Sequence, residues 1–201
     1  AHFDQEWYPR FYGTPPAEQF RIIIGFTNGP CNYGPSRKLT GQPKEVFAIM
    51  NYAVDDNERP IFYKKVVETV VHEFCHSFTK IKGDTEKALE KSGKALQEYT
   101  YFSMRRQAYS TWRNILEESL VRAATICYLI DHNYDEKDIR NAIIEQVDRN
   151  FFWMPELVQT LRYYESHRKK YPTFTSFYPE IIRFFDRYVT NMEKEMKKAM
   201  K

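Results

Sequence analysis

Five consecutive residues, HEFCH at positions 72–76, combine two histidines and a glutamate in the HExxH pattern. Residues four apart share one face of an α-helix, so His72 and His76 can direct their imidazole nitrogens at one metal ion. Glu73 lies about 100° around the helix from His72, where its carboxylate can take a proton from a water molecule at that ion. This chemistry is typical of a zinc-dependent hydrolase.

The chemistry requires this segment to be helical, and its apolar residues support a helix. They recur at steps of three and four, as expected for one buried helical face: Val66, Val67, Val70, Val71, Phe74 and Phe78. We expect Pro60 to begin this helix and Gly83 to end it. The alternative is a chance HExxH on an amphipathic helix whose histidines face solvent or pack, but histidine is scarce enough to make that coincidence rare.

Two histidines and a water molecule leave one protein ligand of a catalytic zinc site unassigned. The metzincin arrangement is excluded, because the positions that would need glycine and histidine hold Thr79 and Lys82. The remaining arrangement, that of the gluzincins, takes a carboxylate from a second helix. Glu117 and Glu118 lie in a strongly helical apolar stretch and are the best candidates.

The sequence leaves the choice between these two glutamates open. Starting from Glu118 places apolar Leu120 and Ala123 where a gluzincin ligand helix has apolar residues, whereas a helical wheel puts Glu117 nearer to the apolar face. His132 is a further alternative. Without a metal, Glu118 and Arg122 would form an ordinary ion pair between residues four apart.

Two more side chains are candidates for contact with a substrate or transition state. Arg122 could fix Glu118 or bind a substrate carboxylate, although a structural ion pair explains it equally well. Tyr164 could donate a hydrogen bond to a developing oxyanion. With 15 tyrosines in the chain, however, packing is the simpler explanation for any one of them.

Composition excludes several classes of protein. The 201 residues carry 30 Lys and Arg against 27 Asp and Glu, a net charge of +3, which predicts no broad attraction to nucleic acid. Three scattered cysteines, Cys31, Cys75 and Cys127, argue against a disulfide framework, and we expect Cys75 and Cys127 to be buried packing residues. There is no apolar run long enough to span a membrane and no recognisable signal peptide. We expect a monomer.

The pattern of elements predicts an α+β, zincin-like fold. Strands are expected at 20–26 and 46–54, the second of which could be a sheet edge that pairs with an extended peptide. Residues 1–19 and 28–43 are expected to be irregular, and later helices are expected near 84–109, 111–131, 135–150, 155–169 and 179–198. One catalytic domain, 1–201, would then comprise a small sheet lobe with the active-site helix (about 1–83) and a helical lobe (about 84–201).

The run HEFCHSF, followed by EESLVRA some forty residues later, resembles a family of bacterial secreted gluzincin-like metallopeptidases. The similarity extends to NYG at 32–34 and YESHRKKYP at 164–172, but only HExxH is specific in itself. The resemblance implies His72, His76 and Glu118 as zinc ligands, Glu73 as the base and an extracytoplasmic location. Several better-known gluzincins have an aspartate four residues after the glutamate ligand, where this chain has Arg122.

These observations together predict a zinc metallopeptidase that hydrolyses the peptide bonds of a peptide or protein substrate. One alternative is a binding protein that keeps the zincin scaffold without turnover, although an intact Glu73 argues against it. The other is a hydrolase of a non-peptide amide, which the same residues would support.

Overall fold

The chain was analysed as a computed structural model that describes residues 3–14, 18–25, 29, 31–61 and 64–200. It divides into two compact units, Ala1–Lys80 and Ile81–Lys201. The first unit contains all of the described strands and the second is helical, so the predicted α+β class is confirmed. The division at 80/81 lies close to the lobe boundary expected near residue 83.

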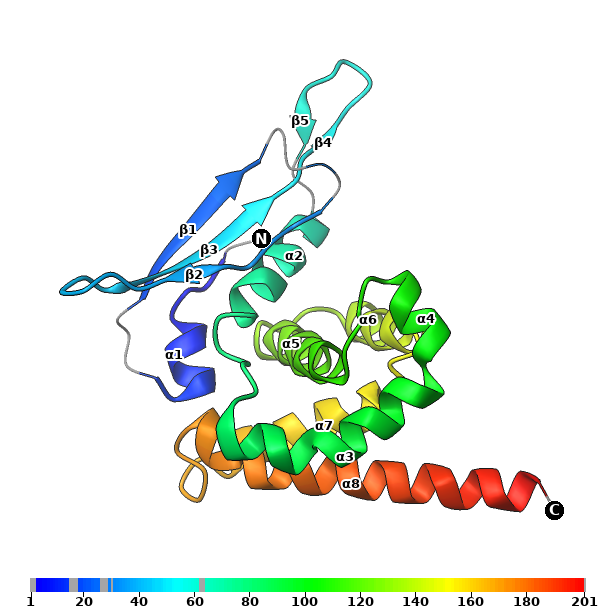
Figure 1. Ribbon diagram of the computed structural model, residues 1–201. Helices are drawn as coiled ribbons and strands as arrows, with labels where there is room; N and C mark the ends of the chain where they lie inside the picture. Colours follow the sequence, from blue (N-terminus) through cyan, green and yellow to red (C-terminus); the bar gives the residue numbers. More distant parts are fainter. Residues whose placement is uncertain (1–2, 15–17, 26–28, 30, 62–63, 201) are drawn as a thin grey trace. The chain divides into compact units, whose positions relative to one another are not determined.

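The first unit is built on a three-stranded sheet with the order β1-β3-β2 (Figure 1). Strand β1 (Glu18–Ile24) runs parallel to β3 (Lys44–Met50), and the short β2 (Ser36–Arg37) pairs antiparallel to the other side of β3. The small hairpin β4 (Ala53–Val54) and β5 (Pro60–Ile61) follows. Helices α1 (Trp7–Tyr12) and α2 (Lys64–Cys75) complete the unit.

Aromatic side chains from helices and sheet form the core of this unit. Tyr8 of α1 packs on Phe20 of β1 and on Phe74 of α2, with ring centroids 5.0 and 6.0 Å apart. Alternate residues of β3, Val46, Ala48 and Met50, are buried, as expected for a strand with one face against the core. The Tyr8 hydroxyl also donates to the carbonyl of Val71 at 3.1 Å, which fixes α1 to α2.

Four expectations for the first unit are corrected. Residues 1–19 are not all irregular, because Trp7–Tyr12 forms a helix that ends at Gly13 in the left-handed region (φ 65°). The range 28–43 is not all loop, since it contains β2. Pro60 lies in β5 rather than beginning a helix, and Gly83 (φ 60°) begins the next helix rather than ending α2. Phe26 lies outside the described residues.

The second unit contains six helices among the described residues (Figure 1): α3 (Gly83–Tyr99), α4 (Tyr101–Arg106), α5 (Trp112–Asp131), α6 (Glu136–Asp148), α7 (Met154–Ser166) and α8 (Phe174–Ala199). The helix expected at 84–109 is thus broken at Thr100. Helix α8 begins earlier than expected, because Thr173 and Ser176 form a capping box and Pro179 lies inside the helix.

Helix α5 is the centre of the second unit. It packs against α3, α6 and α7, and thirteen of its twenty residues are buried. Its N-cap, Thr111, accepts a hydrogen bond from the backbone N–H of Asn114. Because α5 is enclosed on several sides, a charged side chain on it must find partners inside the unit.

Candidate metal centre

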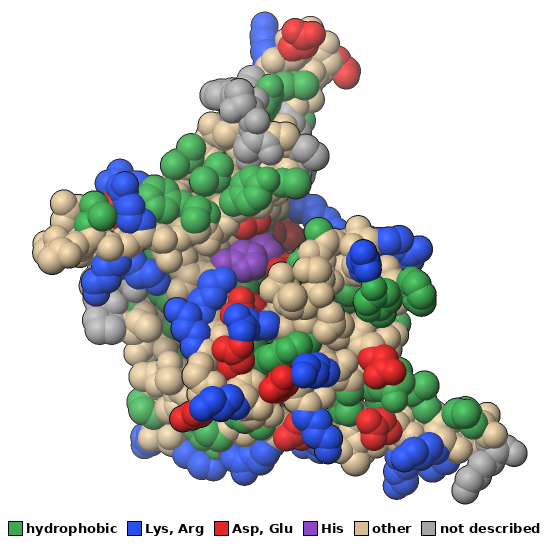
Figure 2. All heavy atoms as spheres, viewed as in Figure 1, with side chains coloured by type: hydrophobic (Ala, Val, Ile, Leu, Met, Phe, Trp, Pro, Cys, Tyr) green, Lys and Arg blue, Asp and Glu red, His purple; other side chains and the backbone are tan. Residues whose placement is uncertain are grey.

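Helix α2 and the turn after it present the two histidines of the HExxH pattern on the side away from the apolar face. Val71, Phe74 and Cys75 are fully buried, while His72 and His76 are partly exposed. The apolar face packs on β3 and therefore fixes the direction of the opposite face. Histidine side chains are visible at the surface on the face drawn in Figure 2.

The two imidazoles lie side by side, as the four-residue spacing predicts. Their ring centroids are 4.9 Å apart and the rings are nearly perpendicular, at 84°. His76 follows the last α-helical residue, Cys75, in a turn that tightens to three-residue hydrogen bonds from Ser77 to Phe74 and from Phe78 to Cys75. The chain therefore keeps a helical path just long enough to bring His76 beneath His72.

Glu73 is only 6% exposed, and its Oε2 lies 4.0 Å from Nε2 of His76. Its backbone is covered by Gly34, which approaches so closely that a Cβ at that position would lie 1.9 Å from the Glu73 carbonyl oxygen. Only glycine fits there without displacing backbone. The NYG segment is thus pressed directly against the turn that carries the predicted base.

Residues 31–35 form an extended edge beside β3. Tyr33 exchanges two backbone hydrogen bonds with Ile49, at 3.0 and 2.9 Å, and the carbonyl of Pro35 accepts from Phe47. The backbone N–H and C=O groups of Asn32 and Gly34 have no hydrogen-bond partner within the described residues. The Asn32 side chain accepts from the backbone N–H of Asn51 at 2.8 Å, which fixes the segment.

This geometry corrects the edge predicted from the sequence. The β3 part of the range 46–54 is the middle of the sheet, paired with β1 on one side and β2 on the other. The open edge next to Glu73 is instead the segment 31–35. Its glycine and proline made it indistinguishable from an ordinary loop in the sequence.

The two glutamates of α5 have different partners. Oε1 of Glu117 accepts a hydrogen bond from the backbone N–H of Ile81 at 2.9 Å. Burial, and then the negative charge of Glu117, raise the pKa of Tyr178. Glu118 is 5% exposed and forms an ion pair of 2.8 Å with Nη2 of Arg122. Neighbouring side chains point about 100° apart around a helix, so the two carboxylates lie in different surroundings.

His72, His76 and Glu118 make up a group that could hold a metal ion. Each offers one ligand atom, and these atoms all lie within 4.8 Å of one another. Glu117 and His132 do not belong to this group. Of the two glutamates that the sequence left open, Glu118 is therefore the one that belongs to this group.

Both terminal nitrogens of Arg122 contact residues of the second unit. Besides Glu118, it donates to Gln146 Oε1 at 2.5 Å and to the Tyr109 hydroxyl at 2.9 Å, and its guanidinium lies over the ring of Phe151. Burial, and then the charge of Glu118, raise the pKa of Tyr109 to about 12. These contacts favour the fixing of Glu118 over the binding of a substrate carboxylate.

The other two candidates lie apart from this group. Tyr164 is fully buried, and its ring packs on Phe174 and Phe177 in the core of the second unit. This placement favours the packing role that the sequence also allowed. His132 caps the end of α5, where its Nδ1 lies 2.8 Å from the carbonyl oxygen of Tyr128 and its ring stacks on that of Tyr128.

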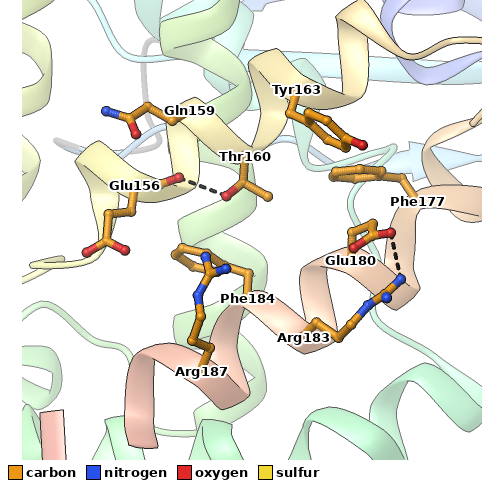
Figure 3. Close-up of a pocket in the computed structure, with 9 residues that line it drawn as sticks. All are labelled: Glu156, Gln159, Thr160, Tyr163, Phe177, Glu180, Arg183, Phe184 and Arg187. Atoms are coloured by element: carbon orange, nitrogen blue, oxygen red, sulfur yellow. Dashed lines mark hydrogen bonds and ion pairs between the residues drawn. The ribbon is translucent and has the colours of Figure 1, made fainter. Parts of the chain in front are cut away.

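A groove of about 410 Å³ runs between α7 and α8 (Figure 3). Phe177 and Phe184 are among its lining residues, and Arg183 and Glu180, which also line it, form an ion pair of 2.6 Å. The residues that the sequence predicts to do chemistry do not line this groove. It is therefore not the candidate site.

Tyr109 and Gln146 were not foreseen from the sequence. Tyr109 lies in the connection before α5, and Gln146 is on α6, where it is an ordinary helical polar residue. Nothing in the spacing of either residue relates it to Glu118. Only the positively charged residue at position 122, four residues after a glutamate, indicated that this carboxylate would have a partner.

Comparisons with known proteins add a family but no activity. No curated protein and no solved structure matches the chain. Among the described residues, none of the helices combines the length and hydropathy needed to cross a bilayer. One family model, described as a domain of unknown function (DUF4932), matches residues 6–184, which is most of the chain. The chain therefore belongs to the DUF4932 family.

Proposed function

We propose that this chain is a zinc-dependent metallopeptidase of the gluzincin type that hydrolyses peptide bonds with Glu73 as the general base. The observation that carries the proposal is the group formed by His72, His76 and Glu118, next to a buried carboxylate that is not part of it. A catalytic zinc site has three protein ligands and one position open to water or substrate.

The donor set fits zinc. Two imidazole nitrogens and one carboxylate oxygen are its usual ligands in hydrolases. A tetrahedral zinc with bonds of about 2.1 Å holds its ligand atoms roughly 3.4 Å apart. Ligand atoms already within 4.8 Å of one another can reach that spacing by modest side-chain rotation. When bound, zinc would polarise an amide carbonyl and lower the pKa of a water molecule.

In this proposal Glu73 would handle the protons of the reaction. Its carboxylate would accept a proton from the attacking water and return it to the leaving amine. The Glu73 side chain is buried and its carboxylate lies 4.0 Å from the His76 imidazole, so its movement is restricted. The tight contact of its backbone with Gly34 would keep it there.

The segment 31–35 supports a peptide substrate over a small amide. An extended peptide adds to a sheet edge through main-chain hydrogen bonds. The backbone groups of Asn32 and Gly34 offer such bonds, and Gly34 touches the residue that would act as base. An amide without an extended backbone would leave these groups unused.

The main alternative is a binding protein on the same scaffold, with or without metal. It would retain the histidine pair and the sheet edge but would have no use for Glu73. Mutation of Glu73 therefore separates the two functions. Hydrolysis of a non-peptide amide would depend on the same residues and is separated by the choice of substrate.

The test measures zinc content and peptide hydrolysis together. Protein purified without added metal should hold one zinc per chain, and His72→Ala should lose it. Cleavage of a fluorogenic peptide library should stop on addition of a chelator and return with zinc. Glu73→Gln should keep zinc yet lose on the order of a hundredfold or more in turnover, since it removes only the base.

Glu68→Gln, on the same helix α2, is the matched control and should turn over like the wild type. Wild-type protein that cannot be loaded with zinc would refute the proposal. A Glu73→Gln variant as active as the wild type would remove Glu73 from the mechanism. A zinc-loaded protein that cleaves no peptide in the library would favour the binding protein.

A further inference from the structure

Strand β1 forms one border of the three-stranded sheet in the first unit, where it pairs with β3 alone (Figure 1). Just after the strand, the N–H of Gly25 donates to the carbonyl of Met50 at 2.8 Å. Backbone groups of alternate strand residues point to the same side, so the residues between those bonded to β3 point away from it: Phe20, Ile22 and Ile24. Their N–H and C=O groups have no hydrogen-bond partner among the residues that the structure describes.

This open edge lacks the features that usually protect one. Sheets blunt an exposed edge with a very short strand, a proline, a lysine or a bulge. Strand β1 is seven residues long, contains neither proline nor lysine, and pairs with β3 in unbroken register. Ile22 and Ile23 are 50% and 42% exposed, and adjacent residues of a strand point to opposite faces. The strand is therefore open along its edge and presents apolar surface on both faces.

The one basic side chain of β1 is occupied within its own sheet. Nε of Arg21 donates to Oε1 of Glu45 on β3 at 2.6 Å, and its Nη2 donates to Oε1 of Gln19 at 3.1 Å. The charge of this arginine is thus balanced by a carboxylate of the neighbouring strand. It does not stand free to repel a strand that approaches the edge.

We propose that β1 is a dimerisation edge: two copies of this chain pair antiparallel along β1 about a two-fold axis at Ile22, which joins their sheets into one of six strands. This register places Ile22 opposite itself, Arg21 opposite Ile23 and Phe20 opposite Ile24. The outward backbone groups of both copies then meet in hydrogen-bonded pairs. An axis at Arg21 would instead set two arginines directly opposite each other, and like charges in that position are unfavourable.

A second copy suits this edge because the register is self-complementary. Isoleucine faces isoleucine across the axis, and an aromatic side chain faces a β-branched one, which are favourable cross-strand pairs. One strand pair makes a small interface, and small interfaces are weak and transient. The monomer expected from the sequence would be the form at low concentration. The segment 31–35 lies on the other side of β3 and stays open, so this inference does not depend on the proposed function.

The test measures sedimentation of the 201-residue chain at increasing concentration, with thermal unfolding to check that each variant folds. Wild-type protein should change from monomer to dimer, with half of the chains paired at roughly 100 µM. Ile22→Lys sets two like charges opposite each other and should weaken pairing by about tenfold or more. The matched control is Ile144→Lys on α6, an isoleucine that is 49% exposed, and it should pair like the wild type.

A mixing experiment tests the register itself. Ile22→Lys and Ile22→Glu proteins should each be monomeric alone, but in a mixture the opposite charges face each other, so the two proteins should pair. A mixture that stays monomeric would overturn the axis at Ile22. A wild-type chain that is monomeric at about 1 mM would overturn the dimer, as would an Ile22→Lys protein that pairs like the wild type.

Amide hydrogen exchange shows whether pairing uses this edge. The outward amides should exchange more slowly as the dimer forms: Phe20, Ile22 and Ile24. Those of Arg21 and Ile23, which face β3, should not change with concentration. A dimer that leaves the outward amides unchanged would form through another surface and would overturn the inference. Protection of these amides in a chain that sediments as a monomer would assign the edge to another segment of the same chain, with the same consequence.

Discussion

Replacing Glu117 and replacing Glu118 of α5 should change different properties of the protein. The size of each change can be worked out from the contacts of the residue. Glu118→Gln removes the charge of the proposed metal ligand but keeps an oxygen that can accept from Arg122. Glu117→Ala removes the acceptor of the Ile81 N–H, a donor on a residue that is almost fully buried. One change should affect zinc and the other should affect the fold.

For Glu118→Gln the expected quantity is the stabilisation that zinc adds to the folded protein. Loss of a ligand should weaken zinc binding by more than about 100-fold, which is the upper range for the loss of residues that only orient a ligand. At saturating zinc, each 100-fold loss of affinity removes about 2.7 kcal/mol of stabilisation. In a chain of this size that corresponds to about 5–10 °C of the zinc-induced rise in melting temperature.

For Glu117→Ala the expected quantity is the stability of the metal-free protein. A buried N–H left without an acceptor costs about 1–3 kcal/mol, which lowers the melting temperature without zinc by several degrees. The zinc-induced rise itself should stay at its wild-type size, because Glu117 is not part of the group with His72 and His76. Differential scanning calorimetry with and without zinc measures both quantities in one experiment.

The reasoning is refuted if Glu118→Gln retains the full zinc-induced rise, or if Glu117→Ala loses it. The first result would mean that the group with His72 and His76 does not bind zinc through Glu118. The second would return the ligand role to Glu117, which the sequence had left possible.

Two further predictions concern the surroundings of the site and the second unit. Gly34→Ala would place a Cβ 1.9 Å from the Glu73 carbonyl oxygen, so it should cost about 1–3 kcal/mol in urea unfolding and lower peptide turnover; an unchanged midpoint would contradict the close packing. Burial, and then the hydrogen bond and charge of Asp131, raise the pKa of Glu165 from 4.5 to about 8, so the folded chain holds a proton that the unfolded chain has released. Stability should therefore fall as pH rises between these values, by about 1–2 kcal/mol after allowing for screening by solvent and Arg162, and Glu165→Gln should flatten the slope. An equal slope in the variant would exclude Glu165 as its cause.

The parts of the fold that follow local patterns were predictable. The apolar periodicity of 111–131 gives α5 almost to the residue, because a continuous buried face leaves little freedom in where the helix lies. The histidine pair was equally local, since only helix geometry joins residues four apart. Trp7–Tyr12 was not predictable in this way: one turn and a half of aromatic residues has no clear period, and its helix depends on packing against Phe20 and Phe74.

The third ligand could not be settled from the sequence because the orientation of each glutamate depends on distant partners. The acceptor role of Glu117 is defined by a backbone N–H 36 residues earlier in the chain. Glu118 forms an ion pair with Arg122 of the same helix, and the arginine is in turn fixed by Tyr109 in the connection before α5 and by Gln146 of α6. A helical wheel contains none of this, and its preference for Glu117 does not match the burial in the structure, where Glu118 is buried and Glu117 is only partly buried.

Glu73 also offers a test of enzyme against binder that needs no substrate. The Glu73 carboxylate is 6% exposed, and burying its charge lowers the stability of the folded protein. In a hydrolase such a destabilising residue is retained because the reaction needs a base. Glu73→Gln has the same shape without the charge, so in an enzyme it should leave the stability of the metal-free protein unchanged or raise it. A structural carboxylate behaves differently: removing its charge from a buried ion pair costs about 3–5 kcal/mol. Chemical denaturation of Glu73→Gln in the presence of a chelator distinguishes the two. A loss of that size would show that the charge of Glu73 holds the fold together, and the binding protein would then be the better explanation of the HExxH pattern.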